Sequence, residues 1–294
     1  MQIIDNQKTL EEFCNRLANK ACLSIDTEFE RRYTYYAQLS IIQVKAEEYC
    51  GIIDALSNLD LNIFNKLLAD NNITKIFHAP REDLEIFYNL FKTLPANVFD
   101  IQIAANICGF GKQLSYDDLC YKLIGITIDK THQKSNWLKR PITSDMLNYA
   151  MLDVEYLYKI YKELNNIIIR NNLTNKYQTT LSAVLDVRNY KVEPKDAWKK
   201  IKYRSDDKSF NHKIQMLAAY REENAQTINI PRKHFILDED LIKLSKYPPL
   251  NHKDFKNLNL KSKYLHKQKY KDEIISLCNN LSKKAINQIT CSLL

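Results

Sequence analysis

Residues 23–29 read Leu23-Ser24-Ile25-Asp26-Thr27-Glu28-Phe29, and polar side chains alternate along them with apolar or β-branched ones. This alternation predicts a β-strand, because successive side chains of a strand point to opposite faces of its sheet. Asp26 and Glu28 are two residues apart, so their carboxylates should project from the same face. The stretch therefore predicts a strand that carries two neighbouring acids.

Two carboxylates would be costly on a central strand of a domain. Removing a carboxylate from water disfavours its charged form unless the group gains a partner. A divalent metal ion is the simplest partner that keeps both acids ionised. A water-exposed strand face is the alternative interpretation, and Asp-x-Glu by itself does not exclude it.

The length and composition describe a soluble globular protein. The 294 residues are 45% hydrophobic and 27% charged, which predicts one large or two modest domains. We expect no membrane association, because no basic leader precedes an apolar run and no apolar stretch reaches about 18 residues. The seven cysteines are scattered without a Cys-x-x-Cys pair, which favours reduced thiols in a cytoplasmic protein, with no disulfide partner.

Positive charge is concentrated in the last third of the chain. Residues 201–294 hold 18 of the 43 Lys and Arg residues but 10 of the 35 Asp and Glu residues. Residues 1–200 are balanced, with 25 of each kind. The asymmetry suggests a C-terminal module that faces a polyanion, nucleic acid first, although lysines that keep a helical domain soluble would give the same count.

The hydrophobic pattern predicts an α/β domain around a mixed sheet. After a helix over 7–17, three short strands separated by turns indicate an antiparallel meander. Strands then alternate with helices, and a long helix is expected from Thr143 to well past Tyr161. The expected strands lie over 23–29, 37–44, 49–53, 73–78 and 98–100.

Two further segments place acids near this sheet. Asp83 follows a predicted strand, one turn into a helix, where an acid taken alone is more often a partner of the helix dipole than a metal ligand. Tyr149 and Asp153 are four residues apart on the long helix, so phenol and carboxylate share a face. A hydrogen bond between them at the surface is the alternative.

Taken together, the segments resemble the DEDD superfamily of 3′→5′ exonucleases, in the branch with a tyrosine in the last motif, and most closely the ribonuclease D family. The likeness covers residues 1–165. The segments that carry it are Ser24-Ile25-Asp26-Thr27-Glu28-Phe29, Tyr35-Tyr36-Ala37-Gln38-Leu39, Phe77-His78-Ala79-Pro80-Arg81-Glu82-Asp83-Leu84-Glu85, Phe99-Asp100-Ile101-Gln102-Ile103-Ala104 and Tyr149-Ala150-Met151-Leu152-Asp153-Val154-Glu155-Tyr156-Leu157.

The resemblance extends to the C-terminal part. Residues 194–198 are similar to the family's link into a helical-bundle HRDC domain, and residues 212–255 are similar to that domain. It implies a ribonuclease H-like exonuclease domain over 1–168, a helical linker over 169–204 and an all-α HRDC nucleic-acid-binding domain over 205–294. The sequence holds one such module where typical members hold two. The resemblance therefore does not determine substrate affinity or processivity. Ile101 and Asn136 also depart from the family pattern.

The family implies hydrolysis assisted by two divalent cations. Ligands that are all oxygen suit Mg²⁺ or Mn²⁺, and two such ions about 3.5–4 Å apart would activate water and stabilise the phosphate charge. By resemblance, Asp26 bridges both ions, Glu28 and Asp153 complete the site of the attacking water, and Asp83 supports the second ion. Tyr149 orients the water, because a phenol with an ordinary pKa near 10 is a poor base.

The sequence also offers candidates for nucleic-acid contacts. Tyr35 and Tyr36, directly after the acidic strand, could stack on a terminal base. His78 is either a hydrogen-bonded core histidine or a group that faces the substrate. Lysines interleaved with aromatic residues after residue 260 favour contact with an RNA backbone over a solvated face: Lys261, Lys263, Lys267 and Lys269.

We therefore expect a monomeric, cytoplasmic 3′→5′ exoribonuclease that trims the 3′ ends of tRNA precursors and other structured RNAs and releases nucleoside 5′-monophosphates. A DNA-directed exonuclease would use the same residues, and the sequence contains no clear reader of the 2′-hydroxyl. A catalytically silent nucleic-acid-binding protein is the other alternative, which the intact set of acids and Tyr149 disfavours.

Overall fold

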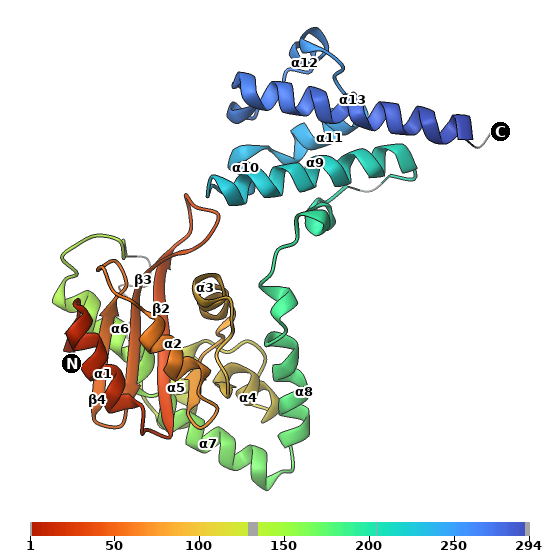
Figure 1. Ribbon diagram of the computed structural model, residues 1–294. Coiled ribbons are helices and arrows are strands. Elements are labelled where there is room, and N and C mark those ends of the chain that lie inside the picture. Colours follow the sequence, from red (N-terminus) through yellow and green to blue (C-terminus); the bar gives the residue numbers. More distant parts are fainter. Residues whose placement is uncertain (1, 129–134, 204, 292–294) are drawn as a thin grey trace. The chain divides into compact units, whose positions relative to one another are not determined.

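The computed structural model describes residues 2–128, 135–203 and 205–291, with side chains as far as residue 280. Contacts divide the chain into two compact units (Figure 1). Unit 1 comprises residues 1–30 and 37–191, and unit 2 comprises residues 31–36 and 192–294. The short segment 31–36 therefore belongs to unit 2 by its contacts, although it connects two strands of unit 1.

A six-stranded mixed sheet forms the centre of unit 1, in the order β1-β4-β3-β2-β5-β6. The antiparallel meander β2-β3-β4 is confirmed, and β1, β5 and β6 join it by parallel pairing. β2 is central, between β3 and β5, as its apolar pattern predicts. The strands are β1 (Gln2–Ile4), β2 (Cys22–Glu30), β3 (Gln38–Ala46), β4 (Tyr49–Asp54), β5 (Thr74–Phe77) and β6 (Val98–Asp100).

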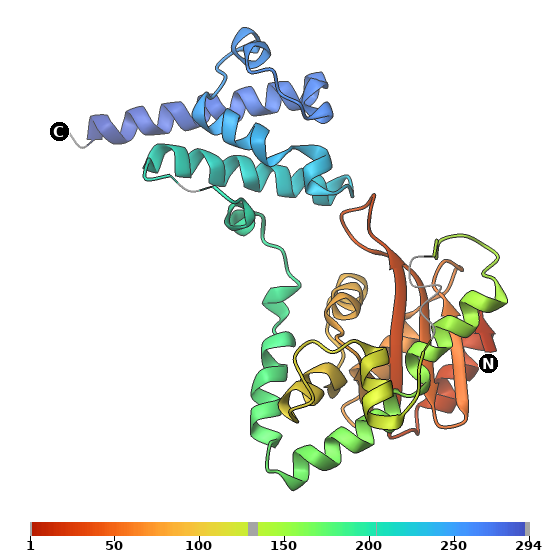
Figure 2. The same ribbon diagram turned by 180° about the vertical axis from the view of Figure 1, so that it is seen from behind.

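Helices cover both faces of this sheet. The two opposite views show α1 and α2 on one face and α6 on the other (Figures 1 and 2). α1 packs closely on β4, because a Cβ at Gly51 would lie 2.9 Å from Cζ of Phe13 on α1, and it would also lie 2.8 Å from Cδ1 of Ile4 on β1. The helices of unit 1 are α1 (Gln7–Leu17), α2 (Asn62–Ala69), α3 (Arg81–Phe91), α4 (Ile101–Ile107), α5 (Tyr116–Ile124), α6 (Ser144–Glu155), α7 (Leu157–Arg170), α8 (Thr174–Val184) and the 3₁₀ helix η1 (Val187–Asn189).

The long helix expected from Thr143 is not continuous, and that prediction is wrong. Thr143 does cap it, since its hydroxyl accepts a hydrogen bond from Met146 N at 3.3 Å. α6 nevertheless ends at Glu155, and α7 begins at Leu157 after Tyr156. The break separates two helices with different neighbours: α6 packs on β2 and β3, and α7 also contacts α4 and α5.

The described part of unit 2 is helical, apart from loops. Its core contains aliphatic and aromatic side chains together with the buried Arg221, which donates to Ile236 O at 3.0 Å and to Asp238 Oδ1 at 2.7 Å. Its helices are η2 (Pro194–Lys200), α9 (Lys208–Thr227), α10 (Arg232–Phe235), α11 (Asp238–Lys246), α12 (His252–Asn257), η3 (Lys263–His266) and α13 (Gln268–Cys291).

Two findings concern the chain as far as it is described. None of its helices combines the length and the apolarity that crossing a bilayer requires. Six cysteines have free thiols, three of them buried: Cys14, Cys22, Cys50, Cys108, Cys120 and Cys278.

Candidate metal centre

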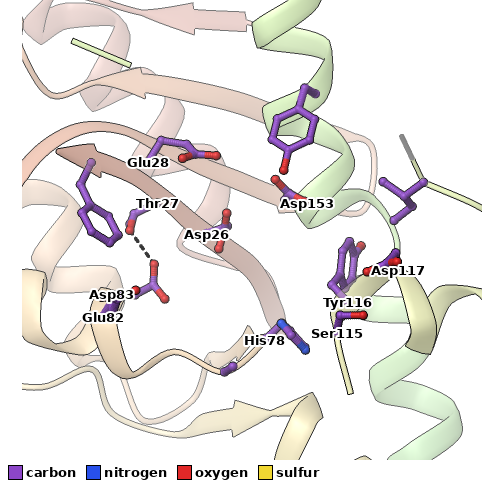
Figure 3. Close-up of a pocket in the computed structure, with 14 residues that line it drawn as sticks. Asp26, Thr27, Glu28, His78, Glu82, Asp83, Ser115, Tyr116, Asp117 and Asp153 are labelled. Carbon is purple, nitrogen blue, oxygen red and sulfur yellow. Dashed lines mark hydrogen bonds between the residues drawn. The ribbon is translucent and has the colours of Figure 1, made fainter. Parts of the chain in front are cut away.

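Three carboxylates meet where α6 crosses β2. Asp26 and Glu28 project from β2, and Asp153 reaches them from α6 (Figure 3). One oxygen from each of the three lies within 4.8 Å of the others. The alternation of β2 brings Asp26 and Glu28 to one side, and the packing of α6 on β2 and β3 supplies the third acid. Among the described residues, this group has the spacing that a bound metal ion requires.

A cavity of about 360 Å³ contains these acids. Its walls come from β2, the junction of β5 and α3, the start of α5, and α6. Acidic, hydroxyl and aromatic side chains dominate the lining: Asp26, Thr27, Glu28, Phe29, His78, Ala79, Glu82, Asp83, Ser115, Tyr116, Asp117, Ile128, Tyr149 and Asp153. All five residues that the family motifs single out therefore share one cavity.

Asp83 occupies a different position from the other acids. It lies in the first turn of α3, is 6% exposed, and accepts a hydrogen bond of 2.5 Å from the Thr27 hydroxyl. Thr27 alternates with Asp26 and Glu28 on the strand, so Asp83 approaches β2 from the side opposite Asp153. Figure 3 shows this pairing of Asp83 with Thr27. Asp83 thus lines the cavity without joining the compact group of three.

Burial and mutual repulsion disfavour charge on the acids. Burial raises the pKa of Glu28 to about 9, of Asp153 to about 7 and of Asp83 to about 6. For Asp26, burial and the carboxylates of Asp83, Asp153 and Glu28 raise the pKa well above its usual value. In the part of the chain that the structure describes, no lysine or arginine forms an ion pair with any of the four.

This donor set fits divalent cations. A cation bound among the carboxylates would restore their charged forms and remove their repulsion. The ligands are oxygen atoms, which Mg²⁺ and Mn²⁺ prefer, and no histidine or cysteine belongs to the group of three. The structure thus places the predicted ligands Asp26, Glu28 and Asp153 together and Asp83 beside them.

Tyr149 lines the same cavity, one helical turn before Asp153. Burial, followed by the nearby carboxylates of Asp153, Glu28 and Asp26, raises the pKa of its phenol above the ordinary value of 10. The hydroxyl therefore keeps its proton at neutral pH. This protonation fits the positioning role that the resemblance implies and does not fit a general base.

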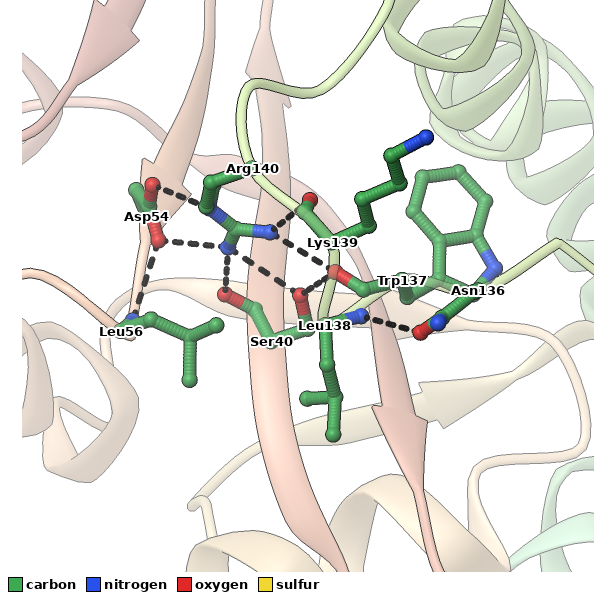
Figure 4. Close-up of polar contacts among 8 residues, drawn as sticks. All are labelled: Ser40, Asp54, Leu56, Asn136, Trp137, Leu138, Lys139 and Arg140. Atoms are coloured by element: carbon green, nitrogen blue, oxygen red, sulfur yellow. Dashed lines mark hydrogen bonds and ion pairs between the residues drawn. The ribbon is translucent and has the colours of Figure 1, made fainter.

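A polar network fixes the segment beside Tyr149 (Figure 4). Arg140 donates to both carboxylate oxygens of Asp54, at 2.8 and 2.6 Å, and to the Trp137 carbonyl at 2.7 Å. The Ser40 hydroxyl donates to the same carbonyl at 2.6 Å. The indole of Trp137, 4% exposed, lies 6.2 Å from the Tyr149 ring between centroids. Sequence reasoning missed this network, because its members lie up to 100 residues apart.

His78 lines the cavity, and its ring contacts the Leu114 carbonyl and the Tyr116 ring. Its Nε2 is 3.0 Å from the Leu114 carbonyl, and its ring centroid is 5.9 Å from that of Tyr116. Burial lowers its pKa, which favours the neutral ring. A neutral Nε2–H that donates to Leu114 O matches the interpretation of His78 as a hydrogen-bonded core histidine, although the ring also borders the acidic cavity.

Tyr35 and Tyr36 lie outside the lining of the acidic cavity and make their contacts within unit 2. Asn229 Oδ1 accepts hydrogen bonds from both backbone N–H groups at 3.1 Å. The Tyr35 hydroxyl donates to Glu222, and the Arg232 guanidinium lies 5.7 Å from the Tyr35 ring. The backbone, hydroxyl and ring of Tyr35 therefore all contact protein groups in this structure.

The four predicted lysines are exposed on unit 2 and differ in their neighbours. Lys261 pairs with Glu239 at 3.0 Å, and Lys269 approaches Glu273 at 4.0 Å. Lys267 lies 4.6 Å above the Tyr264 ring, and Lys263 starts η3. These lysines do not form one continuous cluster of unpaired charge.

Comparison with known proteins gives concordant matches. Residues 1–169 match a family model described as 3′-5′ exonuclease. The chain is 36% identical over 259 residues to ribonuclease D of Bartonella henselae, covering 88% of this chain and 64% of the relative. It is 30% identical over 277 residues to ribonuclease D of Nitrobacter hamburgensis, covering 94% and 72%.

A solved structure agrees with the fold. The crystal structure of Escherichia coli RNase D, described as an exoribonuclease involved in structured RNA processing, superposes with a TM-score of 0.88 at 28% identity, over 96% of this chain and 75% of that chain. The mixed sheet and its helices thus fit the predicted ribonuclease H-like exonuclease fold. The chain spans 64% and 63% of the first relatives, from Bartonella henselae and Acidiphilium cryptum.

Proposed function

Because this chain belongs to the ribonuclease D family, we propose that it is a 3′→5′ exoribonuclease that removes nucleotides one at a time from the 3′ end of RNA. The observation that carries the proposal is the convergence of Asp26, Glu28 and Asp153 within 4.8 Å in an accessible cavity. Family membership supports the class of reaction, and the acids provide the oxygen ligands for the cations that this reaction would use.

Asp26, Glu28 and Asp153 would hold the cations, with Asp83 supporting the second one. Two bound Mg²⁺ or Mn²⁺ ions would lower the pKa of the attacking water and stabilise negative charge on the phosphate. Thr27 keeps the Asp83 carboxylate oriented through its hydrogen bond. The protonated Tyr149 hydroxyl would orient the water for attack on the last phosphodiester bond, and the products are a nucleoside 5′-monophosphate and a shortened RNA with a 3′-hydroxyl.

Unit 2 would bind the RNA and so increase the affinity of the protein for its substrate. We assign residues 205–294 to an HRDC domain and residues 169–204 to a helical linker, which the likeness to E. coli RNase D over 96% of this chain supports. Besides the four lysines, unit 2 has a cavity of about 760 Å³ bordered by Lys256 and Lys271 and by two histidines, His252, which is 3.2 Å from Asp272, and His266. These groups would contact phosphates rather than bases, which suits substrates that vary in sequence.

The substrates that we propose are tRNA precursors and other structured RNAs with 3′ extensions. The likeness to an enzyme described as acting in structured RNA processing supports this class. We further propose a cytoplasmic monomer: the free thiols of the described cysteines fit a reducing compartment, and size-exclusion chromatography with light scattering would report the oligomeric state.

The test is digestion of a tRNA that carries extra 3′ nucleotides, with Mg²⁺ or Mn²⁺ and with product analysis. The wild-type protein should release nucleoside 5′-monophosphates, and Asp26→Asn should lose at least 100-fold in rate while RNA binding persists. Equal activity of both proteins would refute the assigned centre. Matched RNA and DNA single strands in the same assay distinguish a DNA-directed enzyme, and calorimetry without Mn²⁺ binding would indicate a catalytically silent binding protein.

A further inference from the structure

The helix that carries Asp153 is interrupted at a point where the sequence has no helix breaker. α6 ends at Glu155 and α7 begins at Leu157, with Tyr156 between them at φ −108° and ψ −2°. Residues 149–157 contain neither glycine nor proline. Sharp helix breaks otherwise arise where a side chain or water inserts into the backbone hydrogen bonds.

The Tyr116 hydroxyl is the inserted group. It donates to Leu152 O at 3.1 Å and accepts from Tyr156 N at 3.1 Å. Residues 152 and 156 are the pair that an uninterrupted α-helix would join directly, since each N–H bonds the carbonyl four residues earlier. One hydroxyl on α5 thus replaces one hydrogen bond between α6 and α7.

This insertion acts on the residue beside a proposed ligand. Leu152, whose carbonyl the hydroxyl holds, directly precedes Asp153. Tyr116 borders the acidic cavity, but the single proton of its hydroxyl is already donated to Leu152, so it has none for a substrate. Its position therefore indicates a role in the placement of Asp153 rather than in contact with RNA.

We propose that Tyr116 is a positioning residue: its hydroxyl keeps α6 and α7 apart and thereby sets the place of the Asp153 carboxylate beside Asp26 and Glu28. The inference rests on the proposed function, because Asp153 matters to the reaction as a metal ligand. Without the hydroxyl, Tyr156 N–H can bond Leu152 O directly, α6 and α7 can join into one helix, and Asp153 leaves its place.

Tyr116→Phe tests this, with Tyr121→Phe as the matched control, since Tyr121 lies on the same helix and is 68% exposed. Removing a group that orients a metal ligand typically lowers metal affinity or activity about 10–100-fold. We expect calorimetric Mn²⁺ titration to give about tenfold weaker binding for Tyr116→Phe and unchanged binding for Tyr121→Phe. The kcat should fall with KM for a short RNA unchanged, because the carboxylate and not the RNA contact is displaced.

A double-mutant cycle with Asp153→Asn identifies the route of the effect. If Tyr116 acts through Asp153, the Phe substitution should add no further loss of Mn²⁺ affinity in the Asp153→Asn background. Additive losses, an unchanged Mn²⁺ affinity in Tyr116→Phe, or a Tyr116→Phe protein that is unfolded at 25 °C would each overturn the inference. A wild-type protein that binds no Mn²⁺ would instead overturn the proposed function, and this inference with it.

Discussion

The Thr27 hydroxyl donates a hydrogen bond of 2.5 Å to the carboxylate of Asp83, and both groups are buried. One strand therefore presents Asp26 and Glu28 on one side and orients the acid of α3 from the other. The bond also lowers the pKa of Asp83, against the larger effect of burial, which raises it to about 6. Thr27 thus links the fourth acid to the strand that carries the first two.

Replacing Thr27 by valine keeps the shape of the side chain and removes this bond. We expect kcat to fall about 10–100-fold, because Asp83 loses the group that orients it. The free energy of unfolding should fall by about 1–3 kcal/mol, since a buried acceptor loses its partner. Steady-state digestion of a short RNA and urea unfolding measure the two effects.

Thr180→Val is the control for this variant, because Thr180 is an exposed threonine that bonds Lys176 O within α8. It should leave both quantities unchanged. Wild-type kcat in Thr27→Val would show that the orientation of Asp83 does not matter to the reaction.

The metal-free protein should lose stability as the pH rises. The pKa is raised to about 9 for Glu28 and about 7 for Asp153, so the folded state holds protons that the unfolded chain releases near pH 4–4.5. The unfolded state then binds fewer protons, and the free energy of unfolding falls between about pH 4.5 and 9. Thermal unfolding in EDTA across this range measures the trend, and Glu28→Gln should weaken it while Glu11→Gln, at an exposed position, should not.

The stabilisation that Mn²⁺ gives to the protein should increase with pH, opposite to the trend of the metal-free protein. Metal binding requires deprotonated carboxylates, so the increase in unfolding temperature on adding Mn²⁺ should grow from pH 6 to pH 9. The comparison needs the same protein with EDTA and with Mn²⁺ at each pH. An increase that shrinks with pH would contradict the assignment of these acids as ligands.

Some of this site could be read from local sequence, and some could not. The alternation around Asp26 and Glu28 predicts the strand, and the spacing of Tyr149 and Asp153 predicts their shared helical face, because both patterns depend on near neighbours. The family motifs then relate these segments to Asp83. The bond from Thr27 to Asp83 and the insertion of Tyr116 depend on how separate elements pack, so neither leaves a periodic signal. The predicted long helix failed for that reason: nothing within 149–157 opposes a helix, and the group that interrupts it lies on α5.

Arg140 should stabilise unit 1 through its paired bonds to Asp54. The side chains are 27% and 15% exposed, so the charged hydrogen bonds are partly shielded from water. Arg140→Gln should lower the free energy of unfolding by about 1.5–3 kcal/mol. It should also lower kcat, because the Trp137 segment beside Tyr149 loses its support. Arg188→Gln is the control, because the Arg188 side chain is 87% exposed and its pair with Asp186 is screened by water, so its loss should change stability little. Both stabilities are measured by urea unfolding. Equal losses in the two variants would show that the bonds from Arg140 to Asp54 stabilise the protein no more than an exposed ion pair does.

The salt dependence of RNA binding tests the contribution of unit 2. Lys263 and Lys267 are exposed, and neither forms an ion pair with an acid in the described part of the chain, unlike Lys261 and Lys269. If both contact phosphates, Lys263→Gln with Lys267→Gln should weaken binding of a single-stranded RNA. The slope of log affinity against log salt should also become shallower by about 0.7 for each lost contact.

The same double change at Lys8 and Lys66, exposed lysines of unit 1, alters the net charge equally. Fluorescence anisotropy at several salt concentrations compares the two proteins, and the Asp26→Asn background prevents digestion. If the two pairs lower the slope equally, the effect comes from net charge alone, and Lys263 and Lys267 are not phosphate contacts. If only the pair on unit 2 lowers it, Lys263 and Lys267 contact the RNA backbone. The affinity lost at these lysines should then raise KM for long RNAs more than for dinucleotides, because a dinucleotide has no internucleotide phosphate beyond the one at the acids.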